Sequence, residues 1–241
     1  MNKIEPKDRI LVALDVDSAE KALALAEELK DYVGGYKIGK ELFTSAGPEL
    51  VKSIASHSKV FLDLKYHDIP NTVAGAAKAA AKLGVAMFNI HASGGLEMMK
   101  AAADAAKQAA EESGITKPLV LAVTVLTSIN QEILNNELNI EADVAKQVVH
   151  LALLAKKAGC DGVIASAKET KMIKDACGND FAVVTPGIRP LWAASGDQKR
   201  VVTPKDALAD GSDYLVIGRA ITGQPDKIEA AKKILDEIGN L

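Results

Sequence analysis

The chain has 241 residues, of which 48% are hydrophobic and 25% charged, and its formal net charge is −3. This composition is typical of a globular protein and excludes collagen-like, disordered and disulfide-rich classes. The slight negative charge and the 4% of aromatic residues argue against a nucleic-acid coat protein and a base-stacking platform, so we expect no nucleic-acid partner.

Cysteine usage and hydropathy bear on where the protein works. Cys160 and Cys177 form no CxxC pair and no metal-ligand cluster, which predicts two reduced structural thiols. The first ten residues lack the apolar core of a signal peptide, and no stretch reaches the ~18 uncharged apolar residues of a membrane helix. We therefore expect a cytoplasmic protein that does not bind membranes.

Short apolar runs alternate with longer amphipathic stretches along the chain. The runs predict buried parallel strands over residues 10–14, 35–38, 60–64, 87–91, 119–124, 162–165, 182–185 and 214–217. Helices are predicted over residues 18–31, 71–83, 96–112, 143–158 and 225–238, the first capped by Ser18 and the last with Pro225 in its first turn.

This alternation predicts an α/β protein with one domain over residues 1–241, a (β/α)8 TIM barrel. An open doubly wound sheet is the alternative, but the turn after the first strand (DVDSAE, residues 15–20) has no glycine fingerprint. In a barrel, functional residues gather at the carboxyl ends of the strands.

The strongest motif spans the end of the third predicted strand and the segment after it, at residues 61–72 (FLDLKYHDIPNT). Side chains alternate along a strand, so Asp63 and Lys65 are predicted to share the face that looks into the barrel. Charged groups there are unfavourable unless they are paired or used. Asp68 follows in the loop, and Thr72 lies in the first turn of the next helix.

Two more strand ends carry charged residues. Asp15 ends the first strand and Lys37 lies in the second, although each alone is equally well explained as a helix cap or a solvated lysine. With Asp63 and Lys65 they form an alternating array of acids and ammonium groups at the barrel mouth, in which each member stays charged. Such an array suits binding a substrate carboxylate and delivering a proton.

The last quarter of the chain indicates a phosphate site. Gly218 and Arg219 follow the eighth strand, where barrels often supply backbone N–H groups to a phosphate and an arginine can add a bidentate contact. Arg189 and Gln198 lie in the long connection after the seventh strand, which is predicted to close over the substrate as a lid. A plain turn is the alternative for the Gly-Arg pair.

Other candidates are weaker. Thr127 follows the fifth strand, and its hydroxyl either binds the edge of a heterocycle or caps a helix. His91 ends the fourth strand and either lines the site or is a structural histidine. No pattern indicates a Ser/His/Asp triad.

Several of these segments together resemble the orotidine 5′-phosphate decarboxylase family. The segments, spread from the first strand to the eighth, are LVALD, YKIGKELF, FLDLKYHDIPNT, NIHASGG, VTVLTS, VTPGIRP with GDQKR, and YLVIGRAIT. The resemblance implies a (β/α)8 barrel that works as a homodimer with sites at its interface, without cofactor or metal. It implies decarboxylation of orotidine 5′-monophosphate to uridine 5′-monophosphate, the last step of de novo pyrimidine nucleotide synthesis.

The resemblance also implies roles for individual residues. Lys65 matches the proton donor to C6 of the pyrimidine, and Asp63 matches the aspartate beside the substrate carboxylate. Lys37 joins the charged network and, with Asp15, holds the ribose. The remaining matches are Asp68 and Thr72 to the partner subunit's site, Thr127 to the pyrimidine ring, and Arg189, Gln198, Gly218 and Arg219 to the lid and the phosphate.

Two other functions remain open at this point. A Mg²⁺-dependent sugar-phosphate decarboxylase or aldolase of the same barrel superfamily shares an Asp-x-Lys-x-x-Asp core, which DLKYHD (residues 63–68) fits. The segments HDIPNT and PGIR with GDQ argue against it, and a chelator would distinguish it. A non-catalytic nucleotide-binding barrel need not keep Asp63, Lys65 and Asp68 together.

Overall fold

The computed structural model describes residues 4–193 and 202–239. Eight parallel strands form a closed barrel in which each strand pairs with the next and β1 pairs with β8, which excludes the open sheet. All eight predicted strands are present, and their ends differ from the prediction by at most two residues. They are β1 (Ile10–Ala13), β2 (Gly35–Gly39), β3 (Lys59–Tyr66), β4 (Met87–His91), β5 (Leu119–Val123), β6 (Gly162–Ile164), β7 (Ala182–Thr185) and β8 (Tyr214–Ile217).

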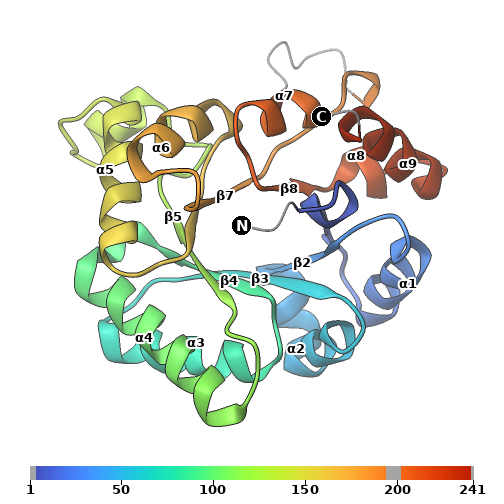
Figure 1. Cartoon of the computed structure of the whole chain (residues 1–241), viewed down its shortest axis with the longest axis horizontal. Coiled ribbons are helices and arrows are strands. Elements are labelled where there is room, and N and C mark those ends of the chain that lie inside the picture. The colour runs from blue at the N-terminus through green and yellow to red at the C-terminus, as the bar shows by residue number, and fades with distance from the viewer. Residues whose placement is uncertain (1–3, 194–201, 240–241) are drawn as a thin grey trace.

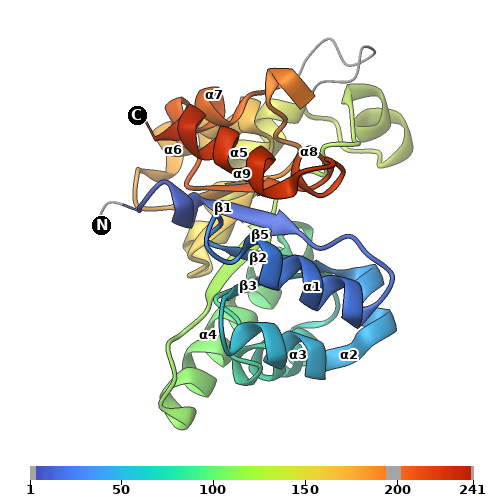
Figure 2. The ribbon, with the colours of Figure 1, turned by 90° about the vertical axis from the view of Figure 1, so that its right-hand side faces the viewer.

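Helices surround the strands and follow one another around the barrel in chain order (Figure 1). Figure 2 shows α9 beside α8 and α1, which closes the ring of helices. The helices are α1 (Ala19–Leu29), α2 (Lys40–Ala55), α3 (Pro70–Lys82), α4 (Gly95–Ser113), α5 (Val144–Lys157), α6 (Thr170–Cys177), α7 (Pro204–Ala209), α8 (Arg219–Thr222) and α9 (Lys227–Ile238). None of the helices in the described ranges is long and apolar enough to cross a membrane.

The five predicted helices correspond to α1, α3, α4, α5 and α9. The predicted place of Pro225 is wrong: α9 begins at Lys227, and the side chain of Asp226 caps it by accepting from the backbone N–H of Glu229. Helix α2 was not predicted, because Gly47 with φ +73° breaks its regular course. Helices α7 and α8 are too short to show an apolar period. Helix α6 was not predicted either, although it is amphipathic.

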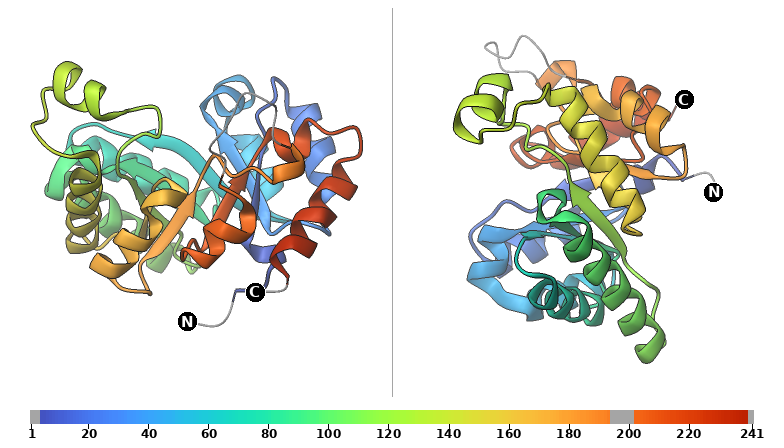
Figure 3. Two further views of the ribbon diagram at one scale, coloured as in Figure 1. Left: turned by 90° about the horizontal axis from the view of Figure 1, so that it is seen from above. Right: turned by 90° about the vertical axis from the view of Figure 1, so that its left-hand side faces the viewer.

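Successive side chains along each strand point alternately outward and inward, into two separate apolar layers. Those that face outward pack against the helices and form the larger core. Those that face inward fill the barrel, and they are Leu11, Ala13, Phe61, Met87, Leu121, Val123, Ile164, Ala182, Val184 and Val216. Figure 3 shows the start of β1 and the end of α9 at one end of the barrel and the β5–α5 connection at the other. The carboxyl ends of the strands lie at this second end.

The pairing of β3 with β4 is irregular near the carboxyl end of β3. Leu62 pairs with Phe88 and Tyr66 pairs with Ile90, so four steps along β3 match two along β4. Lys65 lies inside this bulge with φ +54°, in the left-handed region that an L residue adopts at a cost of about 1–3 kcal/mol. Bulges next to active sites re-aim side chains. Here a bulge, rather than the regular alternation that we expected, sets the direction of Lys65.

Close packing at the start of β6 gives a first prediction. We expect Gly162→Ala to destabilise the protein by about 1–3 kcal/mol or more, because a Cβ there would lie 2.2 Å from the carbonyl oxygen of Ala182. The matched control is Gly75→Ala in α3, where a Cβ has no neighbour within 4 Å and alanine favours the helix by about 1 kcal/mol. Thermal unfolding followed by circular dichroism measures both, and equal melting temperatures would contradict this packing.

Candidate active site

Four charged side chains meet at the carboxyl end of the first three strands. The Lys37 ammonium lies 3.0 Å from Asp15 Oδ1 and 3.6 Å from Asp63 Oδ2, and the Lys65 ammonium lies 2.5 Å from Asp63 Oδ1. The sequence-predicted array is therefore a continuous chain of contacts, ordered Asp15, Lys37, Asp63, Lys65. Carboxylate and ammonium alternate along it, so each charge has a neighbour of opposite sign.

Strand geometry explains how the array forms. Lys37 pairs with Phe61 across β2 and β3, and Asp63 follows Phe61 by two residues on the same inward face. The side chains of Lys37 and Asp63 are only 11% and 13% exposed. The inward face thus changes within two residues from apolar packing to buried charge, which requires compensating partners.

Asp63 stays ionised although it is buried. Burial by itself raises the pKa of its carboxyl group, but Lys37, Lys65 and a hydrogen bond from Asn89 together lower that pKa below its ordinary value. The carboxylate is therefore negative at neutral pH, and it lies between two ammonium groups.

Asn89 is a member of this cluster that the sequence analysis missed. It lies on the inward face of β4 and is fully buried. Its Nδ2 donates to Asp63 Oδ1 at 2.7 Å, and its Oδ1 accepts from the backbone N–H of Lys65 at 2.8 Å. A polar residue at an inward position of an otherwise apolar strand was the available signal.

Two neighbouring cavities that share lining residues lie beside the array. A smaller one of about 220 Å³ is lined by Lys37, Asp63, Lys65 and Thr127 together with apolar side chains. A larger one of about 850 Å³ shares Lys37 and Thr127 and extends from Asp15 toward β7 and β8. The larger cavity by itself is within the size range of small-molecule sites, and Thr127 lines both cavities.

The larger cavity contains the predicted anion-binding residues. Arg189, Gly218 and Arg219 all line it, as does Lys168, which the sequence analysis did not single out. Gln198 lies outside the described residues. The cavity therefore joins a charged array at one side to a cluster of cations at the other.

Asp68 and Thr72 lie apart from the array. Asp68 lies in the loop between β3 and α3 and Thr72 lies in the first turn of α3, and both are exposed. Asp68 Oδ1 accepts the backbone N–H of Ile69 at 2.6 Å. Ile69 is itself 67% exposed. Within the described part of one chain, neither cavity beside the array is lined by Asp68 or Thr72.

His91 ends β4 next to this cluster without lining either described cavity. Its ring centroid lies 5.4 Å from that of His67. Burial lowers the pKa of His91 to about 4, assisted by His67, Lys40 and Lys65, whereas Asp63 acts in the opposite direction. His91 is thus a neutral imidazole at neutral pH.

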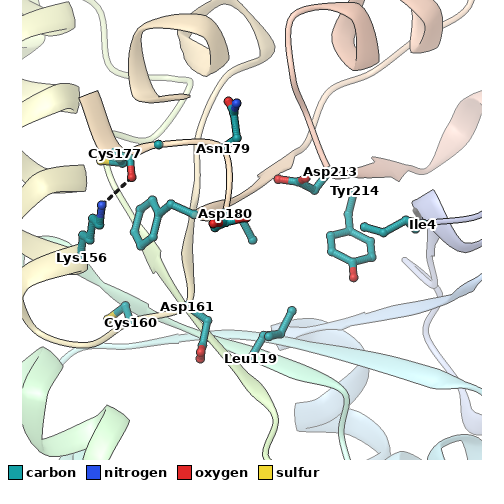
Figure 4. A pocket seen from close by; sticks show the side chains of 13 residues that line it. Ile4, Leu119, Lys156, Cys160, Asp161, Cys177, Asn179, Asp180, Asp213 and Tyr214 are labelled. Atoms are coloured by element: carbon teal, nitrogen blue, oxygen red, sulfur yellow. Dashed lines mark hydrogen bonds between the residues drawn. The ribbon is translucent and has the colours of Figure 1, made fainter. Parts of the chain in front are cut away.

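Another cavity, of about 560 Å³, lies at the amino end of the barrel (Figure 4). Cys160 and Cys177 line it, both as free thiols, and Lys156 donates to the carbonyl oxygen of Cys177 at 2.7 Å. Burial raises the pKa of Cys160 to about 12, so this thiol is not a nucleophile at neutral pH. The described residues also contain no group of three or more side chains placed to hold a metal ion.

The fold and the site together define a (β/α)8 barrel enzyme whose charged groups lie at the carboxyl ends of its strands. The chain belongs to the orotidine 5′-phosphate decarboxylase / HUMPS family, whose model matches residues 8–234. The resemblance inferred from the motifs is thereby confirmed.

Similar proteins cover nearly the whole chain. It is 49% identical over 239 residues to an orotidine 5′-phosphate decarboxylase of Moorella thermoacetica, covering 99% of this chain and 95% of that one. The corresponding protein of Trichlorobacter lovleyi is 52% identical over 239 residues, covering 99% and 98%. The crystal structure of orotidine 5′-phosphate decarboxylase from Lactobacillus acidophilus aligns with a TM-score of 0.85 and 43% identity, covering 95% of this chain and 98% of that one.

The environment of His91 predicts a pH effect on stability. Its pKa is about 4 in the folded protein and about 6.5 in an unfolded chain, so only the unfolded chain binds this proton between these values. The folded state therefore loses stability as the pH falls through this range. We expect His91→Gln to reduce the drop in melting temperature between about pH 7.5 and about pH 5. The exposed His150 gives the control His150→Gln, and identical pH slopes for both variants would refute the assignment.

Proposed function

We propose that this protein decarboxylates orotidine 5′-monophosphate to uridine 5′-monophosphate and CO₂, the last step of de novo pyrimidine nucleotide synthesis. The observation that carries the proposal is the Asp15–Lys37–Asp63–Lys65 array beside a cation-lined cavity. The array occurs in a chain whose sequence is 49% and 52% identical, over 239 residues, to two proteins named for this activity. A cytoplasmic location agrees with the two unpaired thiols.

Lys65 carries the central step. The bond between C6 and the carboxylate carbon breaks, the electron pair stays on C6, and a proton from the Lys65 ammonium forms the new C6–H bond. The intermediate carbanion has no adjacent electron sink, so a cation held against C6 stabilises the charge as it develops. The resulting neutral amine then regains a proton from solvent, which balances the reaction.

Asp63 lies beside the substrate carboxylate in this proposal. The Asp63 carboxylate and the substrate carboxylate repel each other in the buried site. This repulsion decreases as neutral CO₂ leaves and the negative charge develops on C6, next to the Lys65 ammonium. Because Asp63 is held between Lys37 and Lys65, it remains ionised during this process. Lys65 thus has a partner both before and after proton transfer.

The rest of the substrate occupies the larger cavity. Asp15 and Lys37 bind the ribose hydroxyl groups, and Thr127 binds the pyrimidine ring. The phosphate lies against Gly218, Arg219 and Arg189, all of which line this cavity. The resemblance adds Gln198, which lies outside the described residues. Binding energy from the phosphate, distant from C6, helps to hold the reacting groups in place. We expect no cofactor and no metal ion.

We also propose a homodimer in which Asp68 and Thr72 complete the partner subunit's site. Support comes from their place soon after β3, with Asp68 in the loop that follows this strand and Thr72 in the first turn of α3. Ile69, which lies between them, is also exposed and would be covered by the partner subunit in such a dimer.

The proposed proton donor gives the main test of function. We expect Lys65→Ala to lower the rate of CO₂ release from orotidine 5′-monophosphate by about 10⁴-fold or more, with an unchanged circular dichroism spectrum. The exposed Lys146 of α5 gives the control Lys146→Ala, which should keep the parent rate. The unsubstituted protein should also keep its activity in the presence of EDTA. Loss of activity on chelation would favour the Mg²⁺-dependent sugar-phosphate enzyme. Binding of uridine 5′-monophosphate without any release of CO₂ from orotidine 5′-monophosphate would favour a non-catalytic barrel.

The shared site can be tested by mixing variants. Lys65→Ala and Asp68→Ala, each nearly inactive, should together recover about one quarter of the parent activity after subunit exchange, because half of the dimers are mixed and each has one intact site. Lys65→Ala mixed with Asp63→Ala is the control, because those two residues come from one chain and no intact site can form. Absence of recovery in the first mixture, with exchange shown by mass spectrometry, would mean that Asp68 serves its own subunit.

A further inference from the structure

Asn89 occupies the place where the ladder between β3 and β4 breaks. Tyr66 pairs with Ile90, but between Leu62 and Tyr66 the register shifts, so the intervening backbone of β3 has no regular partner on β4. An unpaired backbone N–H in a buried place is unfavourable. The Asn89 side chain supplies the acceptor for Lys65 N at 2.8 Å. It therefore takes over a bond that the regular ladder would have made.

The two ends of the Asn89 carboxamide have different partners. Its oxygen faces a backbone N–H donor on Lys65, and its nitrogen donates to the Asp63 carboxylate at 2.7 Å. A flipped amide would place oxygen against carboxylate and N–H against N–H, so only one orientation satisfies both bonds. The side chain is also fully buried, so bulk solvent does not reach it to replace either partner.

Both partners of Asn89 belong to the charged array, and one of them is strained. Lys65 has φ +54°, and the hydrogen bond from its N–H to Asn89 offsets part of the cost of this conformation. The same Asp63 oxygen that accepts from Asn89 also accepts from the Lys65 ammonium at 2.5 Å. The carboxamide thus contacts the backbone of the lysine and the carboxylate that its ammonium contacts.

We infer that Asn89 is a positioning residue that holds the Lys65 ammonium and the Asp63 carboxylate together at the barrel mouth. The inference rests on the proposed decarboxylation, for which Lys65 must point at C6. Asn89 lines neither of the two cavities, so it acts through Lys65 and Asp63 and not through the substrate. Its loss should therefore lower kcat and leave nucleotide affinity almost unchanged.

Asn89→Ala and Asn89→Asp test this role by different means. Asn89→Ala removes both bonds, and we expect kcat to fall by about 100-fold while the Kd of uridine 5′-monophosphate changes by less than about threefold. Asn89→Asp keeps an acceptor for Lys65 N–H but places a second carboxylate against Asp63. The neighbouring like charge favours protonation of one of the two carboxyl groups, so the acid limb of the kcat profile should move to higher pH. The exposed Asn179 at the amino end of the barrel gives the control Asn179→Asp, which should leave the profile unchanged.

A structural readout keeps this inference separate from the proposed function. In a crystal structure of Asn89→Ala we expect Lys65 to leave the left-handed region or its ammonium to move away from Asp63. This outcome would support the positioning role even if the parent protein released no CO₂, which would overturn only the proposed function. The role of Asn89 would be overturned if the geometry at Lys65 were unchanged in Asn89→Ala. It would also be overturned if Asn89→Ala kept the parent kcat and Asn89→Asp kept the parent pH profile, with both rates expressed per amount of folded protein.

Discussion

The site depends on one constraint: a carboxylate buried near the mouth of a barrel must be neutralised from more than one side. Asp63 meets this requirement through Lys37, Lys65 and Asn89, which come from three adjacent strands. Their convergence needs a closed barrel, because only there do the inward faces of neighbouring strands point at a common axis. It also needs the bulge in β3, since this irregularity sets the direction of Lys65. Strand pairing and site chemistry are therefore linked at β3.

The two ends of the barrel use charged residues differently. At the amino end, Asp161 binds Lys117 and accepts the backbone N–H of Val120. Asp213 similarly binds Lys174 and accepts the N–H of Val183. These carboxylates connect neighbouring strands. At the carboxyl end, Asp63 accepts hydrogen bonds from the side chains of Lys65 and Asn89 and lines a cavity. The first arrangement stabilises the barrel, whereas the second leaves charge available to a ligand.

Sequence patterns predicted much of this architecture and missed parts that depend on context. Every strand was found, since the apolar runs that fill both layers are local in the sequence. Helix α2 was not predicted because Gly47 interrupts its regular course. Pro225 was predicted to lie inside α9, although Asp226 caps that helix. Asn89 escaped for a different reason. A single buried amide has no period or spacing of its own, and its partners lie 24 and 26 residues away.

The sequence by itself determined the class of fold, the family and the identities of the four charged residues, because alternating apolar periods and contiguous motifs are properties of short segments. Only the tertiary structure decided how these residues meet. It put Lys37 between Asp15 and Asp63, joined the array to the cavity lined by Arg189 and Arg219, and matched Asn89 to the bulge. The physical reason is that distances between strands, and the compensation of buried charge, arise from barrel closure, which no segment encodes alone.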